Sequence, residues 1–199
     1  IAQAVPQGPV VLSIPWEFLV LPHPEVSLRP VAPISLPSGS PDDLEAVTQQ
    51  LLESKQPIII TGYAENNAET NSKLIKLAEL LSIPVFETGA ANFPKNHPLY
   101  CGYNATEALA EADTIFLIGA TAPWRPSAAF PQNNARVISV DQDPLNQRLP
   151  YWGYRVDVMV SADIGQFLSA LVDIIRSRLQ KSSNLSHRDR FKRSQSQNQ

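Results

Sequence analysis

Side chains that could carry out chemistry are few in this sequence, and they are scattered. The 199 residues include three histidines and one cysteine. His23 lies in a proline-rich segment, His97 lies between Asn96 and Pro98, and His187 lies near the carboxyl end. A Ser-His-Asp triad or a metal site would have to be built around His97 alone. A structural role for this imidazole, in holding its loop, is the favoured interpretation.

Sequence motifs that hold common cofactors are absent as well. The sequence contains no Gly-x-Gly-x-x-Gly after its first strand, no phosphate loop that ends in Gly-Lys-Ser/Thr, no Cys-x-x-Cys and no His-Glu-x-x-His. Cys101 has no partner for a disulfide. The longest apolar stretches, such as 115–119, are far shorter than the roughly 20 residues that cross a bilayer. We therefore expect a cytoplasmic, globular protein without a membrane partner, and we assign it no catalytic residue and no metal ligand.

Candidates for ligand binding come from the residues that follow the expected strands. A glycine at a strand end lets a ligand approach the backbone, an aspartate there can accept hydrogen bonds from ribose hydroxyls, and an arginine can pair with a phosphate. Together these residue types would suit the ribose and phosphate groups of a nucleotide. The candidates are Gly62, Gly119, Arg125, Asp141 and Asp143.

Each candidate also has a structural interpretation. A tight turn from a strand to a helix needs glycine, so the two glycines could serve their turns alone. The two aspartates could cap a helix that Pro144 opens. The arginine, flanked by Trp124 and Pro126, could contact another domain or subunit. The residue types leave these alternatives open.

The spacing of apolar residues changes along the chain and predicts alternating strands and helices. Ser40 followed by Pro41 marks the start of a helix. Strands that are apolar on both faces and separated by amphipathic helices specify a parallel sheet covered on both sides. The expected fold is α/β, a Rossmann-like doubly wound parallel sheet with helices on both faces and any ligand at the carboxyl ends of the strands. The expected strands are 57–61, 83–86, 114–118, 136–140 and 155–160, and further helices are expected around 74–81, at 106–112 and from 162.

Proline and charge are distributed unevenly, and this predicts the domain boundaries. Nine of the 18 prolines lie in residues 1–41, where each removes a backbone donor. The last 19 residues carry five Lys and Arg against one Asp, without the basic-aromatic repeat that stacks on bases, so no nucleic-acid partner is expected. Because the chain opens with Ile1, we expect it to be a piece of a longer protein. The expected parts are 1–20 with a strand at 9–14, a linker at 21–40, a domain at 41–180 and a basic polar linker or tail at 181–199.

Six short segments, taken in order, resemble one enzyme family. Their order and spacing are similar to those of the central domain of thiamine-diphosphate-dependent enzymes, and most similar to benzoylformate decarboxylase and the large subunit of acetolactate synthase. The resemblance covers about residues 6–178, and it identifies residues 1–20 with the last strand of a preceding pyrimidine-binding domain. The segments are 8–15, 56–62, 77–85, 96–99 with Gly102, 112–119 and 137–144.

The resemblance implies a central, non-catalytic domain of an enzyme that uses thiamine diphosphate and Mg²⁺ to act on 2-oxo acids. The family places its catalytic Glu in the pyrimidine-binding domain, and its Gly-Asp-Gly motif and metal-binding Asn in a diphosphate-binding domain; neither motif occurs here. The implied partners are these two flanking domains, in an enzyme that forms homo-oligomers at full length. This chain alone should be inactive.

Two further expectations follow from the resemblance. Some members of the family hold FAD or ADP in this domain, but the loop 120–126, Ala-Thr-Ala-Pro-Trp-Arg-Pro, is not a glycine-rich cradle and disfavours FAD. A free-standing FAD- or ADP-binding module is the alternative. A domain that packs on neighbours should also expose apolar side chains. The aromatic candidates are Trp16, Phe18, Trp124, Tyr151 and Trp152.

Overall fold

The chain divides into two compact units in a computed structural model, residues 1–36 and 37–199. Each unit is described by itself. The structure describes residues 9–22, 27, 29, 32, 35–64, 67–89, 92–127, 129–147, 149 and 153–181. The expected tail therefore lies outside the described residues, apart from Lys181.

The first unit contains the short helix α1 (Trp16–Val20). Residues 9–15 form no strand, so the expectation of a strand at 9–14 is wrong. An extended segment becomes a strand only when a neighbouring strand pairs with its N–H and C=O groups. Among the described residues, no strand pairs with this segment. Its apolar side chains, including Val11 and Leu12, are exposed.

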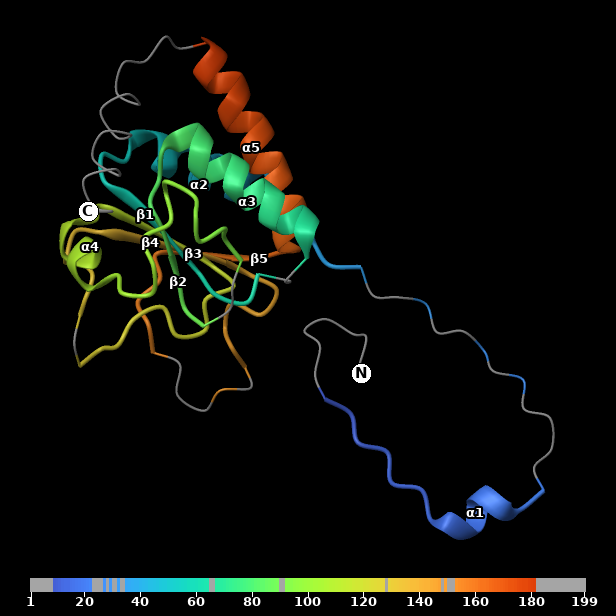
Figure 1. The fold of residues 1–199 in the computed structure, drawn as a ribbon. Coiled ribbons are helices and arrows are strands. Elements are labelled where there is room, and N and C mark those ends of the chain that lie inside the picture. Colours follow the sequence, from blue (N-terminus) through green and yellow to red (C-terminus); the bar gives the residue numbers. More distant parts are fainter. Residues whose placement is uncertain are drawn as a thin grey trace. The chain divides into compact units, whose positions relative to one another are not determined.

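The second unit is built on five parallel strands, which confirms the expected sheet. The spatial order is β2-β1-β3-β4-β5, so the winding direction changes between β1 and β3 (Figure 1). The registers Thr61↔Ile118 and Ile118↔Val140 bring the carboxyl ends of three strands to one edge. The strands are β1 (Pro57–Thr61), β2 (Val85–Glu87), β3 (Thr114–Ile118), β4 (Arg136–Asp141) and β5 (Val158–Ser161).

Two of the helices begin at a residue whose side chain caps the first turn. Ser40 Oγ accepts from the Asp43 backbone N–H at 3.0 Å, and the Ser40 N–H donates to Asp43 Oδ2 at 3.1 Å, which forms a capping box. Asn67 Oδ1 caps the next helix by accepting from the Thr70 N–H at 2.7 Å. No described helix combines the length and apolarity needed to cross a bilayer. The helices are α2 (Pro41–Glu53), α3 (Ala68–Leu81), α4 (Thr106–Glu111) and α5 (Ile164–Lys181).

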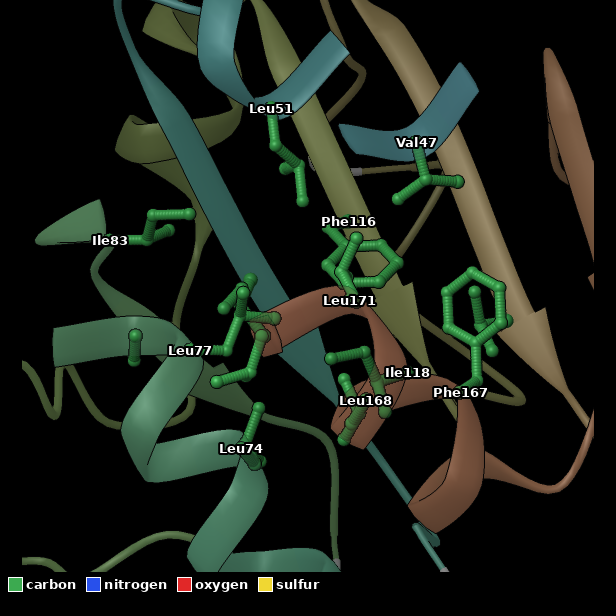
Figure 2. Packing of buried hydrophobic residues seen from close by; sticks show 14 of the residues in the cluster. Val47, Leu51, Leu74, Leu77, Ile83, Phe116, Ile118, Phe167, Leu168 and Leu171 are labelled. Carbon is green, nitrogen blue, oxygen red and sulfur yellow. The ribbon is translucent and has the colours of Figure 1, made fainter. Parts of the chain in front are cut away.

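The core lies in two layers because alternate strand residues point to opposite faces. Ile59, Phe116 and Ile138 pack under α2, α3 and α5, whereas Ile58 and Ile115 pack on the side of α4. Figure 1 shows α2, α3 and α5 on one side of the sheet and α4 on the other. Figure 2 shows side chains from the three larger helices around β3. The expected doubly wound fold, with helices on both faces, is confirmed.

Candidate functional site

Gly62 and Gly119 meet at the point where the sheet changes its winding direction. The Gly62 N–H donates to the Ile118 carbonyl at 3.0 Å, and the Tyr63 N–H donates to the Gly119 carbonyl at 2.7 Å. A Cβ on Gly62 would lie 2.9 Å from Ala120 Cα and closer still to the Gly119 carbonyl oxygen. Gly119 has φ +58°, and a Cβ there would lie 2.7 Å from the Tyr63 carbonyl oxygen. The contact between the two loops thus accounts for both glycines.

Asp141 and Asp143 are brought together at the end of β4, but they bond to their own loop. Asp141 Oδ1 accepts from the Asp143 N–H at 2.9 Å, and Asp143 Oδ2 accepts from the Gln147 N–H at 3.1 Å. The described residues that follow Pro144 form a turn and no helix. The side chains of the two aspartates therefore accept hydrogen bonds from the backbone of a turn. The alternative in which they cap a helix opened by Pro144 is not observed in the described residues.

Burial changes the acidity of one of these carboxyls. It raises the pKa of Asp141 above the ordinary value of 3.8, although a hydrogen bond from the Asp143 backbone opposes the rise. A carboxylate that is partly removed from water at a strand end can accept from a ligand hydroxyl, so its position stays compatible with the expected role.

Arg125 lines a cavity of about 570 Å³ at the carboxyl end of β2. Three separate segments form its walls: the end of β2, the residues that begin α4, and the loop that follows β3. The two glycines and the two aspartates are not among the lining residues. The structure therefore separates the five candidates into a glycine contact, an aspartate turn and an arginine on a cavity wall.

Glu87 is a residue of this edge that the sequence patterns missed. It ends β2 and is fully buried. Its Oε1 accepts from the backbone N–H groups of Asn92 at 2.7 Å and Phe93 at 2.9 Å, and the Tyr100 side chain is a further neighbour of the carboxylate. The expected strand ended at Phe86, so the carboxylate was assigned to a loop. A charged residue directly after an apolar strand was the signal that could have found it.

Asn92 connects this loop to the glycine contact. Its Nδ2 donates to the Gly62 carbonyl and, at 3.3 Å, to Thr61 Oγ1. The side chain is buried, and its Oδ1 has no hydrogen-bond partner within the part of the chain that the structure describes. Glu87 and Asn92 thus fix the backbone after β2 against the end of β1.

His97 holds its loop, as the structural interpretation expects. Its Nδ1 accepts from the Leu99 N–H at 3.2 Å, and its Nε2 lies 3.2 Å from Glu79 Oε1. The ring meets Phe93 edge-on, with 4.9 Å between the centroids. Within the described ranges, no group of three or more His, Cys, Asp or Glu side chains could hold a metal ion.

The aromatic residues expected at a domain interface differ in exposure. Trp16 and Phe18 are each 68% exposed. Trp124 is buried, because it packs edge-on against Tyr154 at 5.1 Å between centroids and accepts a hydrogen bond from the Tyr154 hydroxyl through its carbonyl. The expectation was therefore wrong for Trp124. Two further candidates, Tyr151 and Trp152, lie outside the described residues.

Residues 44–171, most of the second unit, match the family described as the central domain of thiamine pyrophosphate enzymes. The chain belongs to this family. This central domain is 29% identical over 171 residues to 2-hydroxyacyl-CoA lyase 2 of Bos taurus, covering 82% of the chain and 26% of that relative. It is 31% identical over 163 residues to a probable acetolactate synthase large subunit of Methanococcus aeolicus, covering 72% of the chain and 27% of that relative.

Solved structures agree with this assignment. The central domain matches benzoylformate decarboxylase from Polynucleobacter necessarius with a TM-score of 0.72 and 27% identity, covering 87% of the chain and 34% of that structure. The resemblance drawn from the six segments is thus confirmed. The chain spans about a quarter of the length of the curated relatives it matches.

The described residues of the central domain do not fit the site of the family's cofactor. Thiamine diphosphate is held through a divalent cation that bridges its phosphates to oxygen ligands. The carboxylates at the carboxyl edge are used elsewhere, since Asp141 and Asp143 bond to their own turn and Glu87 bonds to the backbone of residues 92 and 93. The described residues of this part of the chain therefore offer no set of oxygen ligands for such a cation.

Proposed function

We propose that this chain serves as the central, non-catalytic domain of an enzyme that acts on 2-oxo acids with thiamine diphosphate and Mg²⁺. The observation that carries the proposal is the family match over residues 44–171, combined with a carboxyl edge whose carboxylates have structural partners. The cofactor would be held by a pyrimidine-binding domain and a diphosphate-binding domain. The enzyme would be a cytoplasmic homo-oligomer.

The division of the chain is part of the same proposal. Residues 1–20 would close the pyrimidine-binding domain, 21–40 would link it to the central domain at 41–180, and 181–199 would lead onward. The exposed apolar side chains of residues 10–21 support this role, because such a segment is stabilised when another domain covers it. Residues 9–15 would then form a strand only when that domain supplies a pairing neighbour.

The central-domain proposal is tested with two proteins. The first is the 199-residue chain, titrated with thiamine diphosphate and Mg²⁺ by calorimetry and assayed with pyruvate and benzoylformate. The second is the benzoylformate decarboxylase of Polynucleobacter necessarius with its own central domain replaced by residues 41–180. We expect turnover of benzoylformate only by the second protein. Turnover by the 199-residue chain, or a folded replacement enzyme that binds the cofactor without any turnover, would overturn the proposal.

Nucleotide binding is a second role that one observation favours. Arg125 lines a cavity at the carboxyl edge of the sheet, and Asp141 ends a strand at the same edge. In this role Arg125 would pair with a phosphate of FAD or ADP and Asp141 would accept from a ribose hydroxyl, whereas Asp143, Gly62 and Gly119 would hold the neighbouring loops. Thermal unfolding with each nucleotide tests this role, with Arg125→Gln as the matched variant. If neither nucleotide raises the melting temperature, the role is rejected.

A further inference from the structure

The cavity at the carboxyl end of β2 has the size of a small-molecule site. Its volume of about 570 Å³ lies within the range of roughly 300–1,000 Å³ typical of ligand pockets. Glu87 belongs to the wall, but this side chain is fully buried and its Oε2 is closed off from solvent, so the carboxylate takes no ligand. The polar and aromatic side chains open to a ligand come from other lining residues, namely Thr88, Tyr103, Asn104, Thr106, Trp124 and Arg125.

One part of the cavity wall is apolar and is held in place by the core. Leu109 of α4 and Trp124 are both buried and belong to the hydrophobic layer on the α4 side of the sheet. Tyr154 meets the Trp124 ring edge-on, and its hydroxyl donates to the Trp124 carbonyl at 3.0 Å. This surface is therefore formed before a ligand arrives, and an apolar group can pack on it without ordering these side chains.

Arg125 brings a positive charge to the same cavity. The residue is exposed, and its guanidinium makes no ion pair with a described residue. It directly follows Trp124, whose ring and carbonyl are both held by Tyr154, so its backbone starts from a fixed point. A guanidinium presents parallel N–H groups that match the two oxygens of a carboxylate.

A second cation, Lys95, lies beside another lining residue. Its Nζ is 5.7 Å from the centroid of the Tyr103 ring, and Tyr103 lines the cavity. The Tyr103 ring also meets the ring of Tyr100 edge-on, with 6.3 Å between the centroids. Within the described ranges, Lys95 makes no ion pair either. Two cations without a carboxylate partner of their own raise the local concentration of anions.

We propose that this cavity binds a small aromatic monocarboxylate, whose carboxylate pairs with Arg125 and whose ring packs on Trp124 and Leu109. The nucleotide role considered above also uses Asp141, which is not among the lining residues. The two roles are therefore separable by experiment. The carboxylate site does not depend on thiamine diphosphate chemistry.

A ligand with one negative charge is favoured over a phosphate monoester with two. The buried carboxylate of Glu87 belongs to the cavity wall, and the exposed Glu107 directly follows the lining residue Thr106. Each nearby carboxylate repels a dianion more strongly than a monoanion. The charge on this edge therefore selects for a carboxylate.

The test titrates the 199-residue chain by calorimetry with 3-phenylpropionate as the probe. Two analogues each remove one part of it: 3-phenylpropanamide lacks the charge, and acetate lacks the ring. We expect each analogue to bind at least about tenfold more weakly than the probe, because each loses one of the two contacts. Phenyl phosphate should also bind more weakly. The proposal is overturned if 3-phenylpropionate does not bind, or if phenyl phosphate binds more tightly than it does.

Variants assign the binding to this cavity. Arg125→Gln, at an exposed position, should weaken binding of 3-phenylpropionate by about tenfold or more, and Lys95→Gln should weaken it less. Arg176→Gln is the matched control, because this exposed arginine of α5 lies on the helix layer that covers the other face of the sheet. Asp141→Asn should leave the affinity for 3-phenylpropionate unchanged. Unchanged affinity in Arg125→Gln, or an equal loss in Arg125→Gln and Asp141→Asn, would refute the site.

Discussion

Gly62 and Gly119, which are 57 positions apart in the sequence, touch at the carboxyl ends of β1 and β3. A Cβ on either residue would meet the backbone of the other loop. The two glycines let the loops join by the Tyr63 N–H to Gly119 carbonyl bond at 2.7 Å. The contact closes the edge of the sheet between β1 and β3.

Alanine at either glycine should destabilise the domain. Gly62→Ala pushes the loop after β1 away from the loop after β3, and it should lower the free energy of unfolding by about 1–3 kcal/mol. Gly119→Ala adds the strain of a left-handed backbone to a similar clash, so its cost should be about 1–2 kcal/mol larger. Gly153→Ala, whose Cβ would meet nothing within 4 Å, is the control. Urea unfolding measures all three; equal midpoints for Gly62→Ala and Gly153→Ala would contradict the steric account.

Asp113 joins the end of α2 to β1 and should be needed for stability. Its Oδ2 accepts from the Lys55 N–H at 2.7 Å, and its Oδ1 accepts from the Gln56 N–H at 3.1 Å and from Ser54 Oγ. Asp113→Ala should cost about 2–3 kcal/mol, because it leaves these donors unpaired. Asp113→Asn keeps one acceptor and should cost less. Chemical denaturation measures the loss of stability in each variant, and Glu111→Ala, at an exposed position, is the control. If Asp113→Ala loses no more stability than Glu111→Ala, the stabilising role of Asp113 is excluded.

The Ser40 capping box should contribute locally to the start of α2. Ser40→Ala removes the acceptor for the Asp43 N–H and should cost about 1 kcal/mol, whereas Ser40→Gly should cost only a few tenths. The difference arises because glycine at this position leaves the end of the helix open to water. Thermal melts of the two variants test the order, and a reversed order would show that the side chain does not act as a cap.

Asp141 should make stability fall as pH rises. Burial raises its folded-state pKa above 3.8, so between 3.8 and the raised value the folded chain holds a proton that the unfolded chain has released. Deprotonation therefore favours unfolding in that window, and the loss persists at higher pH. Asp141→Asn removes this titration and keeps the acceptor for Asp143.

The variant and the unmodified chain should be equally stable below about pH 3.8, and the variant should be more stable at about pH 7. Urea midpoints across this range measure the difference. The exposed carboxylate of Asp173 is the control, and Asp173→Asn should show no such divergence. A difference between Asp141→Asn and the unmodified chain that does not change with pH would rule out the linkage.

Local features of the sequence determined the α/β architecture. The apolar strand 114–118 was predicted at its observed bounds, because a strand covered on both faces must be apolar at every position. The start of α2 was likewise predictable, since Ser40, Pro41 and Asp43 act within one turn. Six segments in order were enough to indicate the family that the match over residues 44–171 established.

Which residues come together at the carboxyl edge of the sheet was decided by the tertiary structure alone. Residues 9–15 carry strand-forming side chains, yet pairing requires a neighbouring strand that no local pattern supplies. The buried carboxylate of Glu87 depends on backbone N–H groups five and six residues later. The cavity at the end of β2 is built from three segments that are separate in the sequence. The sequence placed glycines and charges at the strand ends. Which of them touch, which bond to their own turns and which face open space depends on how the parallel strands bring their carboxyl ends together.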